Sequence, residues 1–323
     1  MDSSEASLEG ILAALLSAGD QASPASRYDS IDDWWPQFES ARRGSSEPID
    51  QALIGGAIAD RVGYAFAAGY QAALLRMDPE LPRDRMACFS VTEEGGGHPK
   101  AIQSRLTLQP DGSYQLSGRK KWATLSSAGG IALIVASTGS DDQGRNQLRT
   151  ARVALDSPGV SVVAMPPTPF SPEIPHRRLE LDGVRVAAEQ LLPGDGYTRF
   201  VKPFRTIEDI HVSAAVLAYL FVVAGRYGWE RSLREELLQL IVSFRALALA
   251  DYTAAAVHIA LEGVFQARHQ LLARCAGQWE RVDAEVRARW ERDAALGSIA
   301  GNARAMRADR AWETVRGQGD ETR

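Results

Sequence analysis

Cysteine is nearly absent from this 323-residue chain, which carries only Cys88 and Cys275. Two cysteines cannot build the disulfide framework that stabilises many small secreted proteins, so a reducing compartment is the natural setting. The chain starts Met-Asp-Ser-Ser-Glu, without the basic segment and apolar core of a secretory signal. We therefore expect a cytoplasmic protein.

Positive charge and long apolar runs are also scarce. The formal net charge is −5, so the chain lacks the basic surplus with which a general nucleic-acid binder displaces counterions from phosphates. The most apolar stretch, residues 210–224, is too short for a membrane span and contains Ser213 and Tyr219. It predicts a buried helix inside a globular protein that is long enough for a sizeable core.

The first part of the chain, residues 1–85, has the pattern of a short helical domain. Apolar residues from Leu8 to Leu16 share one helical face, and a second helical stretch runs from Ile49 to Met77. Between them we expect a loop, because Ser, Pro and Asp are frequent there. Four glycines lower the helix propensity of the second stretch, but such small residues allow another helix to approach closely.

The middle and last parts of the chain differ from each other in texture. Residues 86–202 alternate short apolar and polar runs with Asp-Gly and proline turn signals, which predicts an antiparallel β-barrel or sandwich. Residues 203–323 are helical again, with long periodic segments at 237–249 and 252–272 that predict a helical bundle. The expected fold is α+β, in the order helical domain, β domain and helical bundle.

Two short motifs in the β part carry the functional signal. Residues 89–98 read Phe-Ser-Val-Thr-Glu-Glu-Gly-Gly-Gly-His, a strand followed by a glycine turn whose backbone N–H groups can converge on a phosphate. Residues 118–124 place Trp122 and Thr124 two positions apart, so on a strand both face one side. An aromatic plane beside a hydroxyl suits a flat heterocycle such as a flavin. Because a glycine run alone is usually a turn and a lone tryptophan usually core, the prediction rests on both motifs together.

These motifs and the order of the three parts resemble the acyl-CoA dehydrogenase family over residues 50–319. The family's β domain opens with a stretch like Tyr-Cys-Val-Thr-Glu-Pro-Gly-Ala-Gly-Ser and continues with a Gly-x-Lys-x-Trp-x-Thr-like segment. Residues 181–192 are similar to the family's exit from the β domain, and Val315–Gly319 resembles its Gly-Gly-x-Gly turn. The resemblance implies FAD between the β domain and the bundle. The positions implied to contact it are Phe89, Val91, Thr92, Gly97, His98, Trp122 and Thr124.

The resemblance also implies a reaction, the α,β-desaturation of an acyl thioester. Most members take the α-proton with a glutamate well beyond the Gly-Gly-x-Gly turn, which the residues up to Arg323 do not include. A subset carries its base early in the first bundle helix, where Glu208 matches. Asp209 stands where arginine is common, and a carboxylate there would repel an anionic CoA ester. Read from the residues alone, Glu208 is a helix N-terminal glutamate that follows Thr206 as a cap.

Departures from the family pattern leave two other functions open. Residues 227–231 stand where the family has Arg-x-x-Phe-Gly, and His98 replaces a small serine at a phosphate position. The alternatives are a catalytically degenerate partner subunit or scaffold, and a flavin-dependent monooxygenase-like enzyme. The resemblance implies a homodimer, a homotetramer or a heteromer with a related subunit. It leaves undetermined the acyl group, its carrier (CoA or a carrier protein) and the electron acceptor.

No metal site is expected. Glu208 and His211 have the Glu-x-x-His spacing of di-iron bundles, but such sites need a second helical copy, which the sequence lacks. His258 and His269 are too far apart along one helix to share an ion. The charged stretch 280–292 is most simply a solvated helix face.

Overall fold

A computed structural model describes residues 7–20, 28–126, 129–294, 297 and 301–320; residues 1–6, on which the signal-peptide argument rests, lie outside this part. The chain divides into two compact units. The helical unit comprises Met1–Ala73, Pro169–Ser171 and Thr206–Arg323, and the β unit comprises Leu74–Thr168 and Pro172–Arg205. The helices before and after the strands therefore share one unit, and the three domain limits drawn from the sequence stay a prediction.

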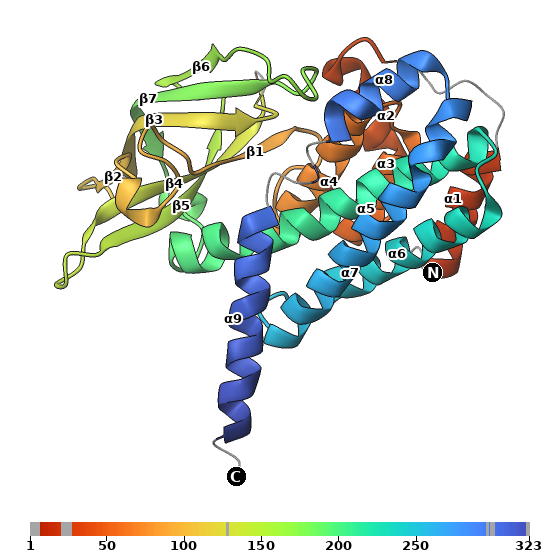
Figure 1. Ribbon diagram of the computed structural model, residues 1–323. Coiled ribbons are helices and arrows are strands. Elements are labelled where there is room, and N and C mark those ends of the chain that lie inside the picture. Colours follow the sequence, from red (N-terminus) through yellow and green to blue (C-terminus); the bar gives the residue numbers. More distant parts are fainter. Residues whose placement is uncertain (1–6, 21–27, 127–128, 295–296, 298–300, 321–323) are drawn as a thin grey trace, which may run out of the picture. The chain divides into compact units, whose positions relative to one another are not determined.

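The helical unit begins with four helices (Figure 1). They are α1 (Leu8–Asp20), α2 (Ile31–Arg42), α3 (Pro48–Ile58) and α4 (Val62–Met77). Helix α2 lies where we expected a loop, so that prediction is wrong. Ser30 caps it by accepting a hydrogen bond from Asp33 N at 3.2 Å, and the buried rings of Trp34 and Phe38 stack with centroids 4.7 Å apart. The cap and this aromatic face outweigh Pro36 inside the helix.

Within the residues that the structure describes, five more helices follow the β part, with a 3₁₀ turn at Cys275–Arg281. They are α5 (Lys202–Arg226), α6 (Arg231–Leu249), α7 (Ala255–Arg274), α8 (Ala284–Asp293) and α9 (Gly301–Asp320). By length and composition the helical stretch Tyr197–Arg226 could cross a membrane, but 83% of its most apolar window is buried inside the protein, which is typical of a core helix. The prediction of a buried helix at 210–224 is confirmed.

Glycines bring α3 and α4 into close contact with α5. A Cβ atom at Gly56 would lie 2.0 Å from the carbonyl oxygen of Ala215, and one at Gly69 would lie 2.5 Å from Cα of Val212. Neither distance is compatible with a side chain, so the backbones touch directly. The glycines that weaken these helices in isolation thus permit their packing, as we expected.

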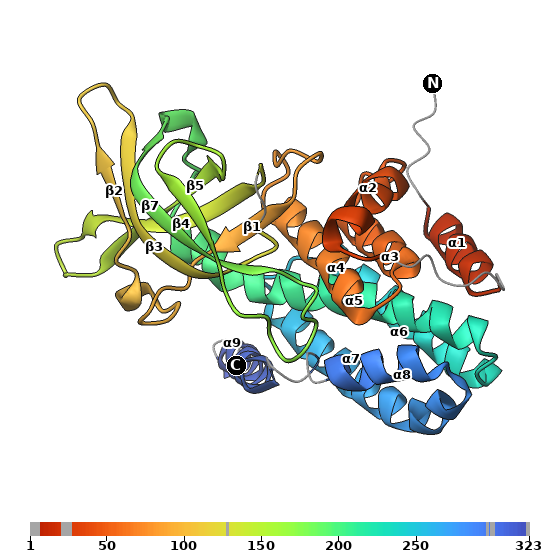
Figure 2. The ribbon, with the colours of Figure 1, turned by 90° about the horizontal axis from the view of Figure 1, so that it is seen from above.

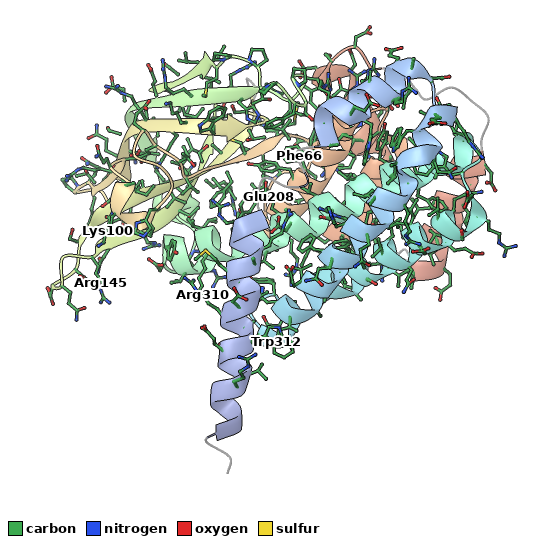
Figure 3. The ribbon with its side chains drawn as sticks, viewed as in Figure 1. Phe66, Lys100, Arg145, Glu208, Arg310 and Trp312 are labelled. Carbon is green, nitrogen blue, oxygen red and sulfur yellow. The ribbon has the colours of Figure 1, made fainter. Side chains whose placement is uncertain are left out.

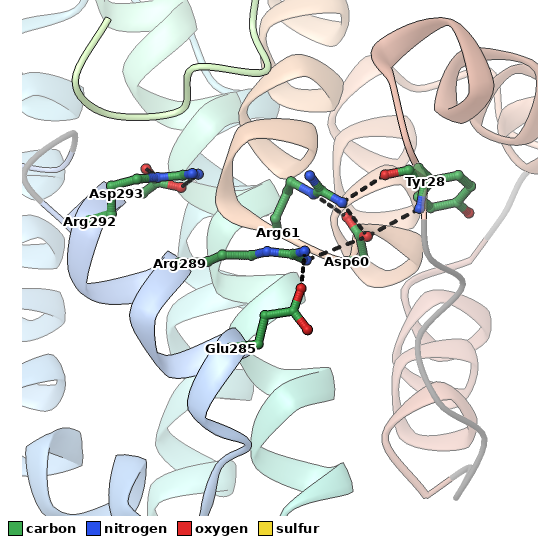
Figure 4. Close-up of polar contacts among 7 residues, drawn as sticks. All are labelled: Tyr28, Asp60, Arg61, Glu285, Arg289, Arg292 and Asp293. Carbon is green, nitrogen blue, oxygen red and sulfur yellow. Dashed lines mark hydrogen bonds and ion pairs between the residues drawn. The ribbon is translucent and has the colours of Figure 1, made fainter.

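An ion-pair cluster joins α8 to the turn between α3 and α4 (Figure 4). The buried carboxylate of Asp60 accepts two 2.8 Å hydrogen bonds from Arg61 and one of 3.2 Å from Tyr28 N. Arg289 of α8 lies 3.9 Å from Asp60 and also pairs with Glu285. The prediction that residues 280–292 are simply a solvated face is therefore wrong for Arg289.

Helix α9 runs unbroken to Asp320, so the turn predicted at Val315–Gly319 is wrong. Its first half packs on the bundle, where Ala308 and Ala311 are buried. Every residue from Trp312 to Gly317 is exposed, and Trp312 exposes 48% of its surface. Figure 3 shows Trp312 on the lower part of α9. The last part of α9 therefore extends beyond the bundle, whereas its first part packs against the bundle.

The β unit is built on one curled seven-stranded sheet (Figure 2). Its strands are β1 (Ala87–Ser90), β2 (Arg105–Leu108), β3 (Tyr114–Thr124), β4 (Ile131–Ser140), β5 (Asn146–Ala154), β6 (Val160–Ala164) and β7 (His176–Val186). The order is β1-β4-β2-β3-β7-β6, with β5 paired to β4. Both β1 and β2 run parallel to β4, so the sheet is mixed rather than antiparallel throughout. Its apolar core includes Leu116, Ile134, Leu179 and Val184.

Candidate functional site

The two sequence motifs lie side by side in the β unit. Lys121 N donates a 2.7 Å hydrogen bond to the carbonyl of Thr92, and Lys120 Nζ donates one of 3.2 Å to the carbonyl of Val91. The segment that follows β1 therefore runs along β3. This contact places Thr92 beside Lys121, the residue before Trp122, although Thr92 and Trp122 are far apart in the sequence.

A buried ion pair holds this contact in place. Lys120 is fully buried, and its Nζ lies 2.5 Å from Glu93 Oε1. The Glu93 carboxylate also accepts hydrogen bonds from Gln103 N at 2.7 Å and Ser104 N at 3.1 Å. The pair thus ties β3 to the segment after β1 and to the residues before β2.

Burial and pairing act against each other on both charges. Burial lowers the pKa of Lys120 to about 8, although the Glu93 carboxylate opposes the shift. Burial disfavours the charged form of Glu93, but Lys120 and the backbone hydrogen bonds outweigh it and hold the pKa of that carboxyl below its usual range. Both residues belong to the recognised motifs, yet sequence reasoning assigned them no role, because nothing in the sequence marks them as buried partners.

The glycine turn is closed by its own backbone. Glu93 and Gly96 exchange two hydrogen bonds, with N···O distances of 3.1 and 3.0 Å, and Gly96 has φ +101°, which side-chain-bearing residues rarely adopt. A Cβ on Gly97 would lie 3.4 Å from Thr92 Oγ1, so the chain folds back onto Thr92. The N–H group of Gly96 therefore already donates a hydrogen bond within the turn. It is not among the N–H groups of this turn that can bind a phosphate.

His98 caps the 3₁₀ turn Pro99–Ala101 that follows. Its Nδ1 accepts a 3.3 Å hydrogen bond from Lys100 N, and the side chain is exposed. Because Nδ1 is occupied as an acceptor, the neutral ring carries its proton on Nε2. That nitrogen is the one that remains for an anion.

Trp122 is exposed and sits on a strained backbone. It exposes 47% of its surface and has φ +58°, and Leu125 beyond it has φ +62°. Left-handed backbone at bulky residues costs on the order of 1–3 kcal/mol each and clusters at functional sites. The pairing of β3 with β7 shifts register between Lys120 and Ala123, so the regular strand alternation that we assumed from the sequence is wrong here.

Trp122 and Thr124 nevertheless converge, because both contact His176. The Trp122 and His176 ring centroids lie 5.6 Å apart at an interplanar angle of 75°, and Thr124 Oγ1 lies 3.1 Å from His176 Nδ1. Burial, together with the nearby Arg177, lowers the pKa of the half-buried His176, so its imidazole is neutral at pH 7. Sequence reasoning missed His176, because its pairing with Thr124 across β3 and β7 has no local signal.

The remaining predicted contact position on β1, Phe89, is buried by packing. Its ring meets that of Phe204 edge to face, with centroids 4.8 Å apart. The side chain therefore serves the core of the β unit. A ligand contact at this position would therefore have to come from the backbone.

The predicted base belongs to the helical unit. Glu208 lies half-buried on α5 (Figure 3). Thr206 is not a cap, because α5 already begins at Lys202; its hydroxyl instead accepts a 3.0 Å hydrogen bond from Arg307. That prediction is wrong, since the helical turn at Tyr197–Val201 continues directly into α5.

Asp209 is compensated by two arginines of α9. Arg304 donates to its carboxylate at 2.7 Å, and Arg307 donates to the other oxygen. These two arginines offset the negative charge by which Asp209 was expected to repel an anionic CoA ester, and the repulsion itself stays a prediction. His211 Nδ1 lies 2.7 Å from the Ile207 carbonyl, and no metal-binding group of three or more His, Cys, Asp or Glu occurs in the described part of the chain.

The segment that replaces the family's Arg-x-x-Phe-Gly is structural. Residues 227–230 connect α5 to α6, which begins at Arg231, and Trp229 is buried there with its ring centroid 5.2 Å from that of Trp279. Trp279 stacks in turn on Trp290 of α8 at 4.8 Å. This aromatic row anchors the 3₁₀ turn and α8 to the end of α5.

Residues 88–184 match the sequence profile described as "Acyl-CoA dehydrogenase, middle domain". All seven positions predicted to contact a cofactor fall inside this match. These residues therefore form a middle domain of the acyl-CoA dehydrogenase type, and the comparisons support placing the chain with that family. A curated relative, the probable acyl-CoA dehydrogenase YngJ of Bacillus subtilis (strain 168), is 27% identical over 173 residues, which cover 51% of this chain and 44% of that protein. The match therefore spans less than half the length of this acyl-CoA dehydrogenase relative.

Solved structures share the fold along nearly the whole chain. Butyryl-CoA dehydrogenase from Megasphaera elsdenii superposes with a TM-score of 0.68 at 16% identity, over 95% of this chain and 99% of that one. A glutaryl-CoA dehydrogenase from Mycobacterium smegmatis in complex with FADH2 superposes with a TM-score of 0.61 at 14% identity, over 94% of each chain. At these identities the likeness establishes the acyl-CoA dehydrogenase fold alone.

Proposed function

We propose that this protein binds FAD and acts as an oxidoreductase that desaturates an acyl thioester carried by CoA or a carrier protein. The observation that supports the proposal most directly is the exposed indole of Trp122, held on a strained backbone beside the Thr124 hydroxyl. Strained backbone of this kind clusters at active sites and ligand clamps, where the surrounding structure holds it. The relative in complex with FADH2 has the same fold.

The β unit has the types of side chain and backbone group that a flavin site needs. Trp122 would offer an aromatic face and Thr124 a hydroxyl to the flavin ring. Backbone groups would come from Phe89 in β1 and from Val91 and Thr92 directly after it. Gly97 and His98 would lie near the pyrophosphate, where the absence of a side chain at Gly97 leaves the approach open. When bound, FAD would supply the hydride acceptor.

Glu208 is the base in this proposal and would remove the α-proton of the thioester. Asp209 is the less suitable carboxylate, because Arg304 and Arg307 already hold both of its oxygens. Assembly as a homodimer, a homotetramer or a heteromer with a related subunit is part of the same proposal.

A partner subunit or binding scaffold without turnover is the second candidate. It is favoured by Asp209, which ties α5 to α9 at a position where an arginine is common in the family. A scaffold of this kind keeps the fold but does not need Glu208. The two candidates therefore differ in whether Glu208 matters.

Visible absorption of the purified protein tests the proposal, with the flavin released by heat and identified. We expect a stoichiometric FAD spectrum that acyl-CoA substrates bleach under anaerobic conditions. Glu208→Gln should stay yellow without bleaching, and Glu313→Gln, an exposed glutamate on α9, is the matched control that should bleach normally. A colourless protein that takes up no added FAD would refute the flavin proposal, and bleaching by Glu208→Gln at the normal rate would refute the role of Glu208.

A further inference from the structure

His176 lies at the centre of the exposed cluster but outside both motifs. It is the first residue of β7 and pairs directly with Thr124 at the end of β3. Its ring packs against the Trp122 indole in a T-shaped arrangement, and its Nδ1 lies 3.1 Å from the Thr124 hydroxyl. We propose that His176 is a positioning residue of the flavin site, which fixes the Trp122 indole and sets the direction of the hydrogen bond made by Thr124. This inference rests on the proposed function.

The contact with His176 is the stronger of the two protein contacts of the Thr124 hydroxyl. The other one, to the carbonyl of Trp122, is 3.4 Å long. O–H···O hydrogen bonds usually span about 2.5–3.0 Å, so the carbonyl contact is long and His176 determines how the hydroxyl is oriented. The imidazole and the hydroxyl are both able to donate or to accept.

This pair can serve a ligand atom that changes from acceptor to donor. A hydroxyl has one hydrogen and two lone pairs. When His176 donates from Nδ1, Thr124 has its hydrogen available for an acceptor such as N5 of an oxidised flavin. When Nδ1 accepts, Thr124 gives its hydrogen to His176 and offers a lone pair to a donor such as N5–H of a reduced flavin. A change of tautomer at His176 therefore lets Thr124 satisfy both redox states without moving.

The reduced state depends on His176 more than the oxidised state does. Thr124 can accept a hydrogen bond from N5–H only if its own hydrogen has a partner, and His176 Nδ1 is the nearer acceptor that the structure places beside it. Without the imidazole, Thr124 still donates to an oxidised ring. Removing His176 should therefore weaken the binding of reduced FAD more than that of oxidised FAD.

Three substitutions separate positioning from simple packing. His176→Phe keeps an aromatic ring against Trp122 but removes the hydrogen bond to Thr124. His176→Asn keeps a polar atom at the place of Nδ1, which can donate or accept. His269→Phe, at an exposed position on α7, is the matched control. If His176→Phe does not fold, His176→Gln replaces it, because its amide lies one bond further from the backbone than Nδ1.

The measurement is the dissociation constant of the protein for oxidised and for reduced FAD, together with the flavin reduction potential. For His176→Phe we expect reduced FAD to bind about tenfold more weakly relative to oxidised FAD, which lowers the two-electron potential by about 30 mV. In His176→Asn, which keeps the hydrogen bond but loses the ring beside Trp122, the ratio of the two dissociation constants should stay within about twofold of that of the unmodified protein, and in His269→Phe both constants should.

Each result decides a different question. Unmodified protein that binds FAD, together with His176→Phe whose potential and affinities are unchanged, would overturn the role of His176 and leave the proposed function standing. An equal loss of potential in His176→Phe and His176→Asn would also overturn it, because the hydrogen bond would then be irrelevant. Failure of the unmodified protein to bind FAD would refute the proposed function, and this inference with it.

Discussion

Replacing Lys120 with methionine should destabilise the β unit strongly. The substitution keeps an unbranched side chain in the buried space but leaves the Glu93 carboxylate without its cation. Removal of one partner from a buried ion pair typically costs about 3–5 kcal/mol. Two backbone N–H groups still hydrogen-bond to Glu93, so we place the loss at the lower end, about 3 kcal/mol.

Hydrogen exchange of the β3 and β7 amides reports on this unit specifically. A loss of about 3 kcal/mol corresponds to exchange about a hundredfold faster in the most protected amides. The matched control is Lys121→Met, the adjacent lysine, whose partner Glu94 is largely exposed. Exposed pairs contribute about 0–1 kcal/mol, so this control should change exchange little.

The double variant Lys120→Met/Glu93→Gln completes the experiment. Neutralising both residues removes the unpaired buried charge while an amide oxygen still accepts from the backbone, so most of the lost stability should return. Equal exchange in Lys120→Met and Lys121→Met would refute the reasoning. It would mean that the Lys120–Glu93 pair does not hold the two motifs together.

Three further predictions follow from the packing and the charges. Gly56→Ala should lower the free energy of unfolding of the helical unit by about 2 kcal/mol or more, because the new Cβ would lie 2.0 Å from a backbone oxygen of α5. Gly263→Ala, in open space on α7, should instead raise it by about 1 kcal/mol. Urea unfolding measures both changes. The pKa of His176 is lowered in the folded state, so the unfolded state binds more protons and the free energy of unfolding should fall as the pH drops below 6.5. His176→Asn should remove this part of the pH dependence. Unfolding measured at pH 7.5 and at pH 5.5 makes the comparison. Asp209→Asn should destabilise the packing of α9 on α5 by about 2 kcal/mol or more, because Arg304 and Arg307 lose their buried counter-charge. Faster amide hydrogen exchange in the first half of α9 measures this loss.

The sequence predicted those features of the fold that local patterns determine. Helices before and after a β part, the end of α4 at Met77 and the buried nature of residues 210–224 all follow from periodicity and proline placement. The errors arose where two local signals compete. Pro36 suggested a loop at α2, although Ser30 caps that helix, and Gly317 suggested a turn within α9, although a helix tolerates a glycine at modest cost.

The site was predictable only in part, because its geometry depends on pairings between distant segments. Trp122 and Thr124 are visible in the motif, but the register shift that turns the indole outward is a property of β3 against β7. His176 carries no motif and enters the site only through that pairing. The burial of Lys120 against Glu93 is likewise invisible in a sequence where lysine is normally a surface residue.

The exposed end of α9 has a practical consequence for biochemical work on this chain. Short stretches of helix without tertiary packing are marginally stable in water, and every residue from Trp312 to Gly317 is exposed. Limited digestion with trypsin should therefore cut first at Arg316. The cut would spare Arg304 and Arg307, whose bonds to Asp209 hold the first half of the helix on the bundle. A dye, an affinity label or a surface tether attached in this last stretch would thus report on the protein without disturbing either unit.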